Sequence, residues 1–243
     1  MKPTIITIRE LRSVNPSTDC FIIKNALPID SCVRIVEFLN FFSANFAENV
    51  KSAGQNWRYF PKNNGNFFET YIFNELDLID SAFLFEAFRR LFDLYNMLGE
   101  ATFLNDFERE TKISSFSTDF RIINPLVFRY PTEKSRFGFH KHDSRNQKFQ
   151  LLTNLTMPGI DYVGGETWVY MQEGRPDIYD PKLSEKCVIF GEEFQMGDTL
   201  SFPYHYWHQV LTPKDAIYKG GKRISLLMPL GCRNSEDFPN EYL

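Results

Sequence analysis

The chain has 243 residues, of which 43% are hydrophobic and 16% aromatic, so it has enough apolar surface for a packed core. Its 27 basic and 31 acidic residues give a net charge of -4 and are mixed along the chain, which provides no basic patch for nucleic acid or an anionic membrane. No apolar run approaches the roughly 20 residues that span a bilayer, and charges occupy the N-terminal stretch where a signal peptide has its apolar centre. We therefore expect a cytoplasmic globular protein.

The four cysteines are scattered along the chain and show no C-x-x-C spacing. That spacing is typical of zinc sites, and an evenly paired framework is typical of disulfide-rich secreted domains. We interpret each cysteine as a small buried apolar side chain. They are Cys20, Cys32, Cys187 and Cys232.

Two amphipathic helices are predicted in the first half of the chain. Residues 27–42 begin with Asp30 or Ser31 as the helix N-cap and place apolar side chains at helical spacing, namely Val33, Ile35, Val36, Leu39 and Phe42. Residues 75–99 place an aromatic and leucine stripe on one face, formed by Leu84, Phe88, Leu91, Phe92 and Tyr95, and Gly99 is the expected stop. We interpret both stripes as packing surfaces.

The segment between these helices is rich in Gly, Asn and polar residues, which is typical of a loop or a loose hairpin. Its side chains Trp57 and Arg58 are candidates to line a substrate pocket. Trp168 and Trp207, much later in the chain, are further candidates for the same pocket.

From about residue 115 the pattern changes to short β-like segments separated by Gly, Pro, Asp and Asn. Seven such segments in some 115 residues predict a jelly roll, the double-stranded β-helix. The expected fold is mainly β with N-terminal helices (α+β), and residues 1–243 are expected to form one domain, with a helical portion over about 1–115 and a core over about 116–243. The strands are expected within 119–130, 148–155, 166–171, 187–190, 198–202, 207–211 and 223–230.

All four histidines fall in two short clusters, "GFHKHDS" and "FPYHYWHQV". Imidazole is the commonest protein ligand for transition metals. Residues i and i+2 of a strand point to the same side, so His140 and His142 can converge on one metal. His208 lies on a later predicted strand that can lie across from them, whereas His205 follows a proline and is expected in a loop.

A third element follows His208 in "KGGKRISLL", where Arg223 and Ser225 again stand at i and i+2. A guanidinium and a hydroxyl on the same side of a strand can bind one carboxylate through paired N–H donors and an added O–H. The sequence therefore predicts a site for an acidic cosubstrate.

Five segments in this order resemble the iron(II) and 2-oxoglutarate-dependent dioxygenases, especially the branch of the prolyl and lysyl hydroxylases. Residues 161–165 resemble the D-Y-x-G-G turn of that family, "GDTLSFP" followed by His208 resembles the strand of its distal histidine, and Arg223 and Ser225 resemble its R-x-S clamp. The resemblance covers about residues 120–230; its five segments are "FRYP", "FHKHD", "LTNLTMPGIDYVGGETWV", "GDTLSFPYHYWHQV" and "GGKRISLL".

The chain departs from the family at the metal site, because the family's H-x-D or H-x-E triplet is absent. Strand alternation favours a three-histidine site of His140, His142 and His208. A β-bulge could instead bring Asp143 to the metal beside His140. A third arrangement uses His142 and His208 with Ser144 at the carboxylate position, which leaves a coordination position vacant.

The resemblance implies Fe(II), 2-oxoglutarate and O2 as cofactors, with Tyr130 adding a hydrogen bond to 2-oxoglutarate, and hydroxylation as the outcome. We expect a small-molecule substrate such as an amino acid or a natural-product intermediate, although prolyl or lysyl peptides are also compatible. Two other functions stay open. "HKH" also matches the H-x-H of cupin metal enzymes, which do not use 2-oxoglutarate, and the missing carboxylate is compatible with a non-catalytic jelly-roll binding protein.

Overall fold

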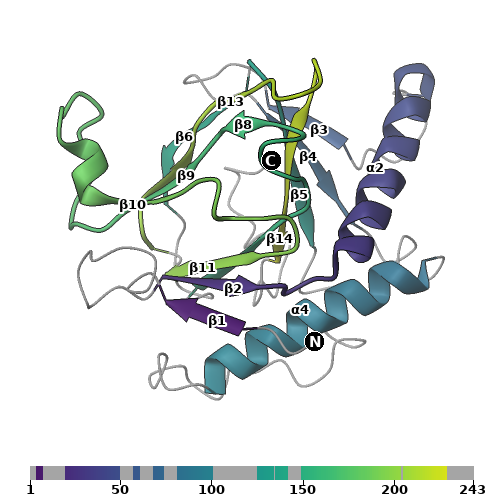
Figure 1. Ribbon diagram of the computed structural model, residues 1–243, viewed down its shortest axis with the longest axis horizontal. Helices are drawn as coiled ribbons and strands as arrows, with labels where there is room; N and C mark the ends of the chain where they lie inside the picture. Colours follow the sequence, from purple (N-terminus) through teal and green to yellow (C-terminus); the bar gives the residue numbers. More distant parts are fainter. Residues whose placement is uncertain are drawn as a thin grey trace.

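The computed structural model describes residues 4–7, 20–49, 57–60, 68–73, 81–100, 125–133, 135–141, 149–203 and 205–228. This part of the chain is mainly antiparallel β-structure with two long helices, α2 (Ile29–Asn49) and α4 (Ala82–Glu100), as the sequence predicts. In Figure 1 the helices lie along two sides of the strands. None of the described helices is long and apolar enough to cross a membrane.

The strands form a large sheet and a small sheet. The large sheet has the order β1 (Thr4–Thr7), β2 (Phe21–Lys24), β11 (Thr199–Pro203), β7 (Phe149–Asn154), β14 (Lys222–Met228), β5 (Leu126–Pro131), β4 (Phe68–Ile72) and β3 (Trp57–Phe60). The small sheet has the order β10 (Cys187–Phe190), β9 (Thr167–Tyr170), β12 (His208–Val210) and β6 (Phe137–His140). A short pair, β13 (Pro213–Lys214) with β8 (Val163–Gly164), and a 3₁₀ turn, η3 (Leu183–Lys186), complete the described elements.

All seven segments predicted as strands contain strands in the structure. The first part of the chain also contributes β1 and β2, which the sequence analysis did not predict, and β3 and β4. β2 pairs with β11 and β4 pairs with β5, so strands from both sides of residue 115 share the large sheet. The polar segment between the helices includes the antiparallel pair of β3 and β4, and so matches the hairpin alternative.

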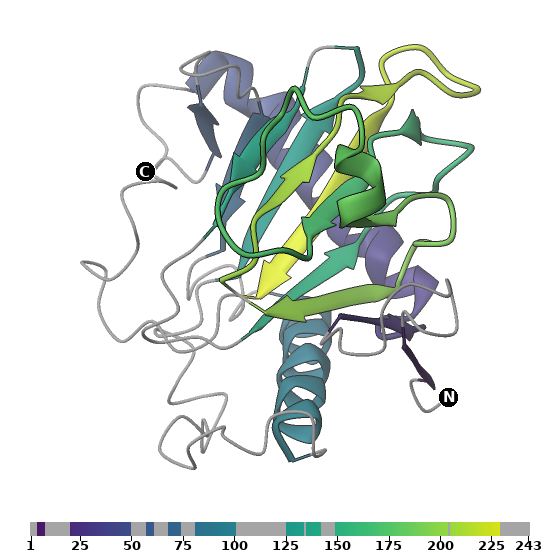
Figure 2. The same cartoon turned by 90° about the vertical axis from the view of Figure 1, so that its left-hand side faces the viewer.

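Alternation along the central strands divides the core into two clusters. Ile23, Val127, Leu151 and Leu226 pack with the helices, whereas their neighbours Ile22, Phe128, Leu152 and Leu227 pack with the small sheet. Because successive side chains of a strand point to opposite faces, the large sheet is covered on both faces. The helices form one outer layer and the small sheet forms the other; Figure 2 looks onto the small sheet, with α2 behind it.

The helix boundaries differ from the prediction. α2 begins at Ile29, and the carbonyl of Pro28 accepts the N–H of Cys32 at 3.1 Å, so Asp30 and Ser31 lie in the first turn and are not the N-cap. Val33 is 41% exposed, because the buried stripe runs through Cys32, Ile35 and Leu39.

α4 continues through Gly99 to Glu100, since one glycine costs a helix only about 1 kcal/mol. The predicted stripe of Leu84, Phe88, Leu91 and Phe92 is buried, which confirms that part of the prediction. The side chains of Phe42 and Tyr95 lie outside the described residues.

The described cysteines, Cys20, Cys32 and Cys187, are buried and unbridged, as predicted. Burial raises the pKa of Cys32 and of Cys187 to about 12, so both thiols are protonated at neutral pH. Cys232 lies outside the described residues.

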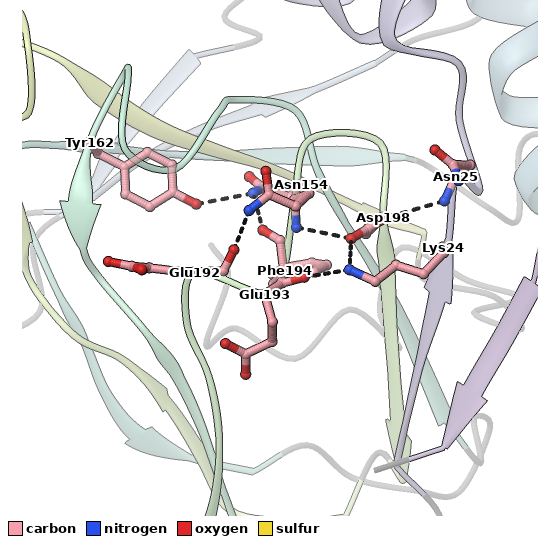
Figure 3. A network of polar contacts seen from close by, with 9 residues as sticks. Lys24, Asn25, Asn154, Tyr162, Glu192, Glu193, Phe194 and Asp198 are labelled. Carbon is pink, nitrogen blue, oxygen red and sulfur yellow. Dashed lines mark hydrogen bonds and ion pairs between the residues drawn. The ribbon is translucent and has the colours of Figure 1, made fainter. Parts of the chain in front are cut away.

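A polar network joins the N-terminal part to the core (Figure 3). The buried carboxylate of Asp198 accepts hydrogen bonds from Lys24 Nζ at 2.6 Å, from the backbone N–H of Asn25 at 3.1 Å and from that of Gln195 at 2.9 Å. Beside it, the Asn154 amide donates to the Phe194 carbonyl at 2.9 Å. These bonds fix the turn that leads into β11.

Candidate active site

His140 and His208 lie side by side on neighbouring strands of the small sheet. His140 ends β6, His208 begins β12, and the two residues are direct partners in the antiparallel register. Their ring centroids lie 4.1 Å apart with the planes at 57°. The register shifts between this pair and the pair of Val210 with Phe137, so β6 has one extra residue there. Such a bulge re-aims side chains, and it places both imidazoles between the two sheets.

Each imidazole is oriented by a backbone carbonyl. Nδ1 of His140 lies 2.8 Å from the Gly138 carbonyl oxygen, and Nδ1 of His208 lies 2.9 Å from that of Tyr206. A carbonyl only accepts, so Nδ1 carries the proton in both rings and Nε2 carries the lone pair. This is the tautomer and the kind of support that metal-binding histidines have.

Burial also keeps His208 ready to bind a metal. His208 is 6% exposed, and desolvation lowers its pKa to about 4, a shift that the hydrogen bond with the Tyr206 carbonyl partly offsets. The ring is therefore neutral at physiological pH, as a metal ligand must be.

Arg223 lies in β14 on the face that the large sheet turns toward the small sheet, and only 1% of it is exposed. Its Nη1 donates to the Gly165 carbonyl, and its Nη2 donates to Thr167 Oγ1 at 2.7 Å. These two acceptors hold the guanidinium in one orientation. Among the described residues no carboxylate forms an ion pair with Arg223.

The glycines that precede β9 bring the Gly165 carbonyl close to Arg223. Gly164 and Gly165 have φ values of 66° and 65°, which favour glycine. A Cβ at Gly165 would lie 2.9 Å from Cβ of Pro213. The D-Y-x-G-G segment therefore supports the arginine through its backbone.

Two buried polar atoms at this place have no hydrogen-bond partner in the described part of the chain, Nε of Arg223 and Oγ of Ser225. Leaving such groups unpaired costs about 1–3 kcal/mol each, so their arrangement fits an anionic ligand. Thr167, which binds the guanidinium, pairs with Val210, two residues from His208. Strands rise about 3.4 Å per residue, so the guanidinium is anchored about 7 Å along the sheet from His208. That separation suits a short dicarboxylate.

Two buried tyrosines lie near the guanidinium. The Tyr130 ring centroid lies 5.8 Å from Cζ of Arg223, and burial raises the pKa of Tyr130 far above its usual value, although Arg223 opposes the shift. The Tyr162 oxygen accepts a hydrogen bond from the Asn154 amide at 3.0 Å, and its pKa is also raised by burial. Both phenols are therefore protonated donors at neutral pH.

Several polar residues of the site were missed by the sequence analysis. Thr167 and Tyr162 lie inside a segment that was used only as a motif, and Asn154 pairs with Ser225 on the neighbouring strand. Gln150 is 3% exposed, and its amide Nε2 lies 3.5 Å from Nε2 of His208. The available signal was strand alternation, since Gln150, Leu152 and Asn154 share one face of β7.

Trp168 and Trp207, which are expected to line a substrate pocket, are both half-buried, and that expectation stays a prediction. Trp168 stands between Thr167 and Val169, which face the space between the sheets, so alternation places it on the other face of the small sheet. Its indole Nε1 is buried there and lacks a hydrogen-bond partner among the described residues. Trp207 precedes His208, and its ring lies 5.5 Å from the Lys141 amine and 5.8 Å from the Arg175 guanidinium.

β3, which carries Trp57 and Arg58, is the outer strand of the large sheet beyond β4, and its side chains lie outside the described residues. His142, Asp143 and Ser144 also lie outside them, so the third metal ligand stays a prediction. Within the described residues no group of three His, Cys, Asp or Glu side chains could hold a metal. His205 is exposed in the turn before β12, as a loop residue would be.

Comparison with solved structures shows which known proteins share this fold. No protein-family model and no curated protein sequence matches the chain. A Pseudomonas putida prolyl-4-hydroxylase structure superposes with a TM-score of 0.58 at 11% identity, covering 88% of this chain and 93% of that one. The chain has the fold of the prolyl hydroxylases. A Trichoplax adhaerens prolyl hydroxylase, solved with a hypoxia inducible factor peptide fragment, has a TM-score of 0.52 at 15% identity, covering 91% of this chain and 86% of that one.

Proposed function

We propose that this protein is an Fe(II) and 2-oxoglutarate-dependent dioxygenase that hydroxylates an unactivated C–H bond. One observation carries the proposal: the same site contains two imidazoles whose Nε2 atoms carry the lone pair and a buried guanidinium whose Nε lacks a hydrogen-bond partner among the described residues. The prolyl hydroxylase fold supports it, and so does the order of the motifs. In this proposal the two sheets form a double-stranded β-helix within a single domain.

Iron would be held by Nε2 of His140 and of His208. The third ligand is proposed from the segment directly after β6, with His142 preferred and Asp143 through a bulge as the alternative. In the least favoured arrangement, His142 replaces His140 beside His208, and Ser144 stands at the carboxylate position and leaves a coordination position vacant. His140 and His208 are kept in the ligating tautomer by their carbonyl partners, so no proton has to leave either ring when a metal binds.

The chain would bind 2-oxoglutarate through its far carboxylate. Arg223 Nε–H and Ser225 O–H point to the same face of β14, and Gly165 and Thr167 hold the guanidinium in place for them. Tyr130, protonated by burial, can donate a further hydrogen bond. With iron bound, 2-oxoglutarate and O2 supply the oxidation, in which 2-oxoglutarate becomes succinate and carbon dioxide and one oxygen atom enters the substrate.

We propose a small molecule, such as an amino acid or a natural-product intermediate, as the substrate. The mixture of basic and acidic residues along the sequence supports this choice, because it provides no basic tract for a nucleic acid. A prolyl or lysyl side chain in a peptide is the alternative, and a substrate panel distinguishes the two.

The test measures succinate formed from labelled 2-oxoglutarate by the Fe(II)-loaded protein, alone and with free amino acids or prolyl and lysyl peptides. We expect slow succinate formation without substrate and a marked increase with the true substrate. The His208→Ala variant should lose this activity, whereas His205→Ala, an exposed histidine three residues away, should retain it.

Two results would overturn the proposal. Metal-dependent oxidation without succinate would indicate a cupin-type enzyme, a function that leaves the buried Arg223 and Ser225 unexplained. A protein whose thermal stability responds to neither Fe(II) nor 2-oxoglutarate would be a non-catalytic jelly roll, because tight ligands stabilise the folded state by mass action.

A further inference from the structure

Gln150 lies at the proposed metal site but belongs to none of the motifs. It stands in β7, near the start of the strand, and its side chain crosses from the large sheet toward the small one. Leu151 packs on the helix side and Leu152 packs between the sheets, so Gln150 shares the inner face with Leu152. There its amide Nε2 lies 3.5 Å from the nitrogen of His208 that would bind the metal.

Burying the Gln150 amide among apolar side chains has a free-energy cost. Gln150 pairs in register with Phe202, which is fully buried and lies edge-on to His208 with ring centroids 4.8 Å apart. Its contact with His208 Nε2, at 3.5 Å, is at the long limit of a hydrogen bond. Burying an amide that is bonded so weakly is costly, whereas a leucine of similar size would stabilise an apolar contact. The amide is therefore better explained by a ligand than by packing.

The distance to His208 locates the amide at the edge of a metal's coordination sphere. Two ligand atoms in neighbouring positions on an octahedral metal lie about 3 Å apart when each bond is about 2.1 Å. An amide nitrogen has no available lone pair and does not bind the metal. When a metal takes the lone pair of His208 Nε2, the facing N–H of Gln150 loses that acceptor and needs another one.

We propose that Gln150 is a positioning residue whose amide N–H faces His208 Nε2 in the metal-free protein and donates to a metal-bound carboxylate oxygen of 2-oxoglutarate in the loaded one. This inference rests on the proposed function. It predicts that Gln150 contributes to the affinity for 2-oxoglutarate and not to the affinity for the metal. A structural role would change neither affinity selectively.

The test compares Gln150→Leu with Gln209→Leu in anaerobic titrations. Gln209 follows His208 in β12, is half-buried and points to the opposite face, so it is a matched control. Mn(II) affinity is measured first, and the 2-oxoglutarate affinity of the Mn(II)-loaded protein is measured second. For Gln150→Leu we expect Mn(II) affinity within about threefold of wild type and 2-oxoglutarate affinity about tenfold weaker, the effect of one hydrogen bond to a charged group. Gln209→Leu should change neither.

A second variant, Gln150→Glu, keeps the shape and replaces the donors with a negative charge. We expect it to bind Mn(II) at least as well as wild type and 2-oxoglutarate more than tenfold more weakly, because like charges repel.

Three outcomes would overturn the inference. A loss of tenfold or more in Mn(II) affinity on Gln150→Leu would make the amide oxygen a metal ligand. Unchanged 2-oxoglutarate affinity in either Gln150 variant, with a wild type that binds both ligands, would remove Gln150 from the site and leave the proposed function standing. A wild-type protein that binds neither Mn(II) nor 2-oxoglutarate would refute the proposed function and this inference together.

Discussion

Replacing Arg223 with methionine tests whether this arginine binds a ligand or only supports the fold. The variant loses the hydrogen bonds to Gly165 and Thr167, but it also removes a buried charge that no described carboxylate neutralises. These effects oppose each other, because an uncompensated buried charge is itself costly. We expect the melting temperature without ligand to change by no more than about 4 °C, the effect of roughly 1 kcal/mol in a chain of this size.

Ligand binding should respond far more strongly. A hydrogen bond to a charged group contributes about 1.5–3 kcal/mol, so losing the bond from Arg223 Nε–H weakens 2-oxoglutarate binding by about 10- to 150-fold. At a concentration about 100 times its Kd, 2-oxoglutarate stabilises wild type by about 2.7 kcal/mol. This corresponds to a rise of roughly 5–10 °C in melting temperature, and Arg223→Met should show at most about half of it.

The assay is thermal unfolding of the Mn(II)-loaded protein with and without 2-oxoglutarate, measured on wild type, Arg223→Met and Arg89→Met. Arg89 is an exposed arginine of α4, 3.9 Å from Asp93 in an i,i+4 pair of the kind that contributes little to stability. It should behave as wild type. The reasoning is refuted if Arg223→Met keeps the full 2-oxoglutarate shift, or if its melting temperature without ligand falls by more than about 10 °C.

Other predictions concern the metal, the glycine turn and the polar network. His208→Ala should lose Mn(II) binding by equilibrium dialysis while His205→Ala retains it; equal retention would exclude His208 as a ligand. Gly165→Ala should cost about 1–3 kcal/mol in urea unfolding and weaken 2-oxoglutarate binding, whereas Gly174→Ala, at φ 83° with no atom within 4 Å of the added Cβ, should show only the backbone strain of about 1 kcal/mol. Asp198→Ala should cost about 3 kcal/mol, because it removes the ion pair with Lys24, which keeps only the Glu193 carbonyl among the described residues, and leaves two backbone N–H groups unpaired. A loss below about 1 kcal/mol would contradict the network.

Much of the fold follows from local patterns. The strands in the second half of the chain were predictable because they are short, rich in β-branched and aromatic residues, and separated by turn residues. The strands of the first part were not, since β2 and β4 owe their place in the sheet to pairing with β11 and β5, which lie far away in the sequence. Pairing of this kind leaves no local periodicity.

The candidate site was predictable only in part, for the same reason. Four histidines in two clusters indicated which imidazoles could meet, and the pairing of His140 with His208 agrees with that expectation. Strand alternation places Gln150 on one face of β7, but its approach to His208, like that of Thr167 to Arg223, depends on how the two sheets pack.

The central claim is that His140 and His208 bind iron through Nε2 while Arg223 and Ser225 bind 2-oxoglutarate. An anaerobic crystal structure with Mn(II) and 2-oxoglutarate tests it most directly, since anomalous scattering locates the metal. We predict one Mn(II) about 2.1–2.3 Å from both Nε2 atoms, with the far carboxylate on Arg223 Nε and Ser225 Oγ, and the map would also show whether His142 or Asp143 is the third ligand. A metal bound elsewhere, or a carboxylate away from Arg223, would contradict the claim.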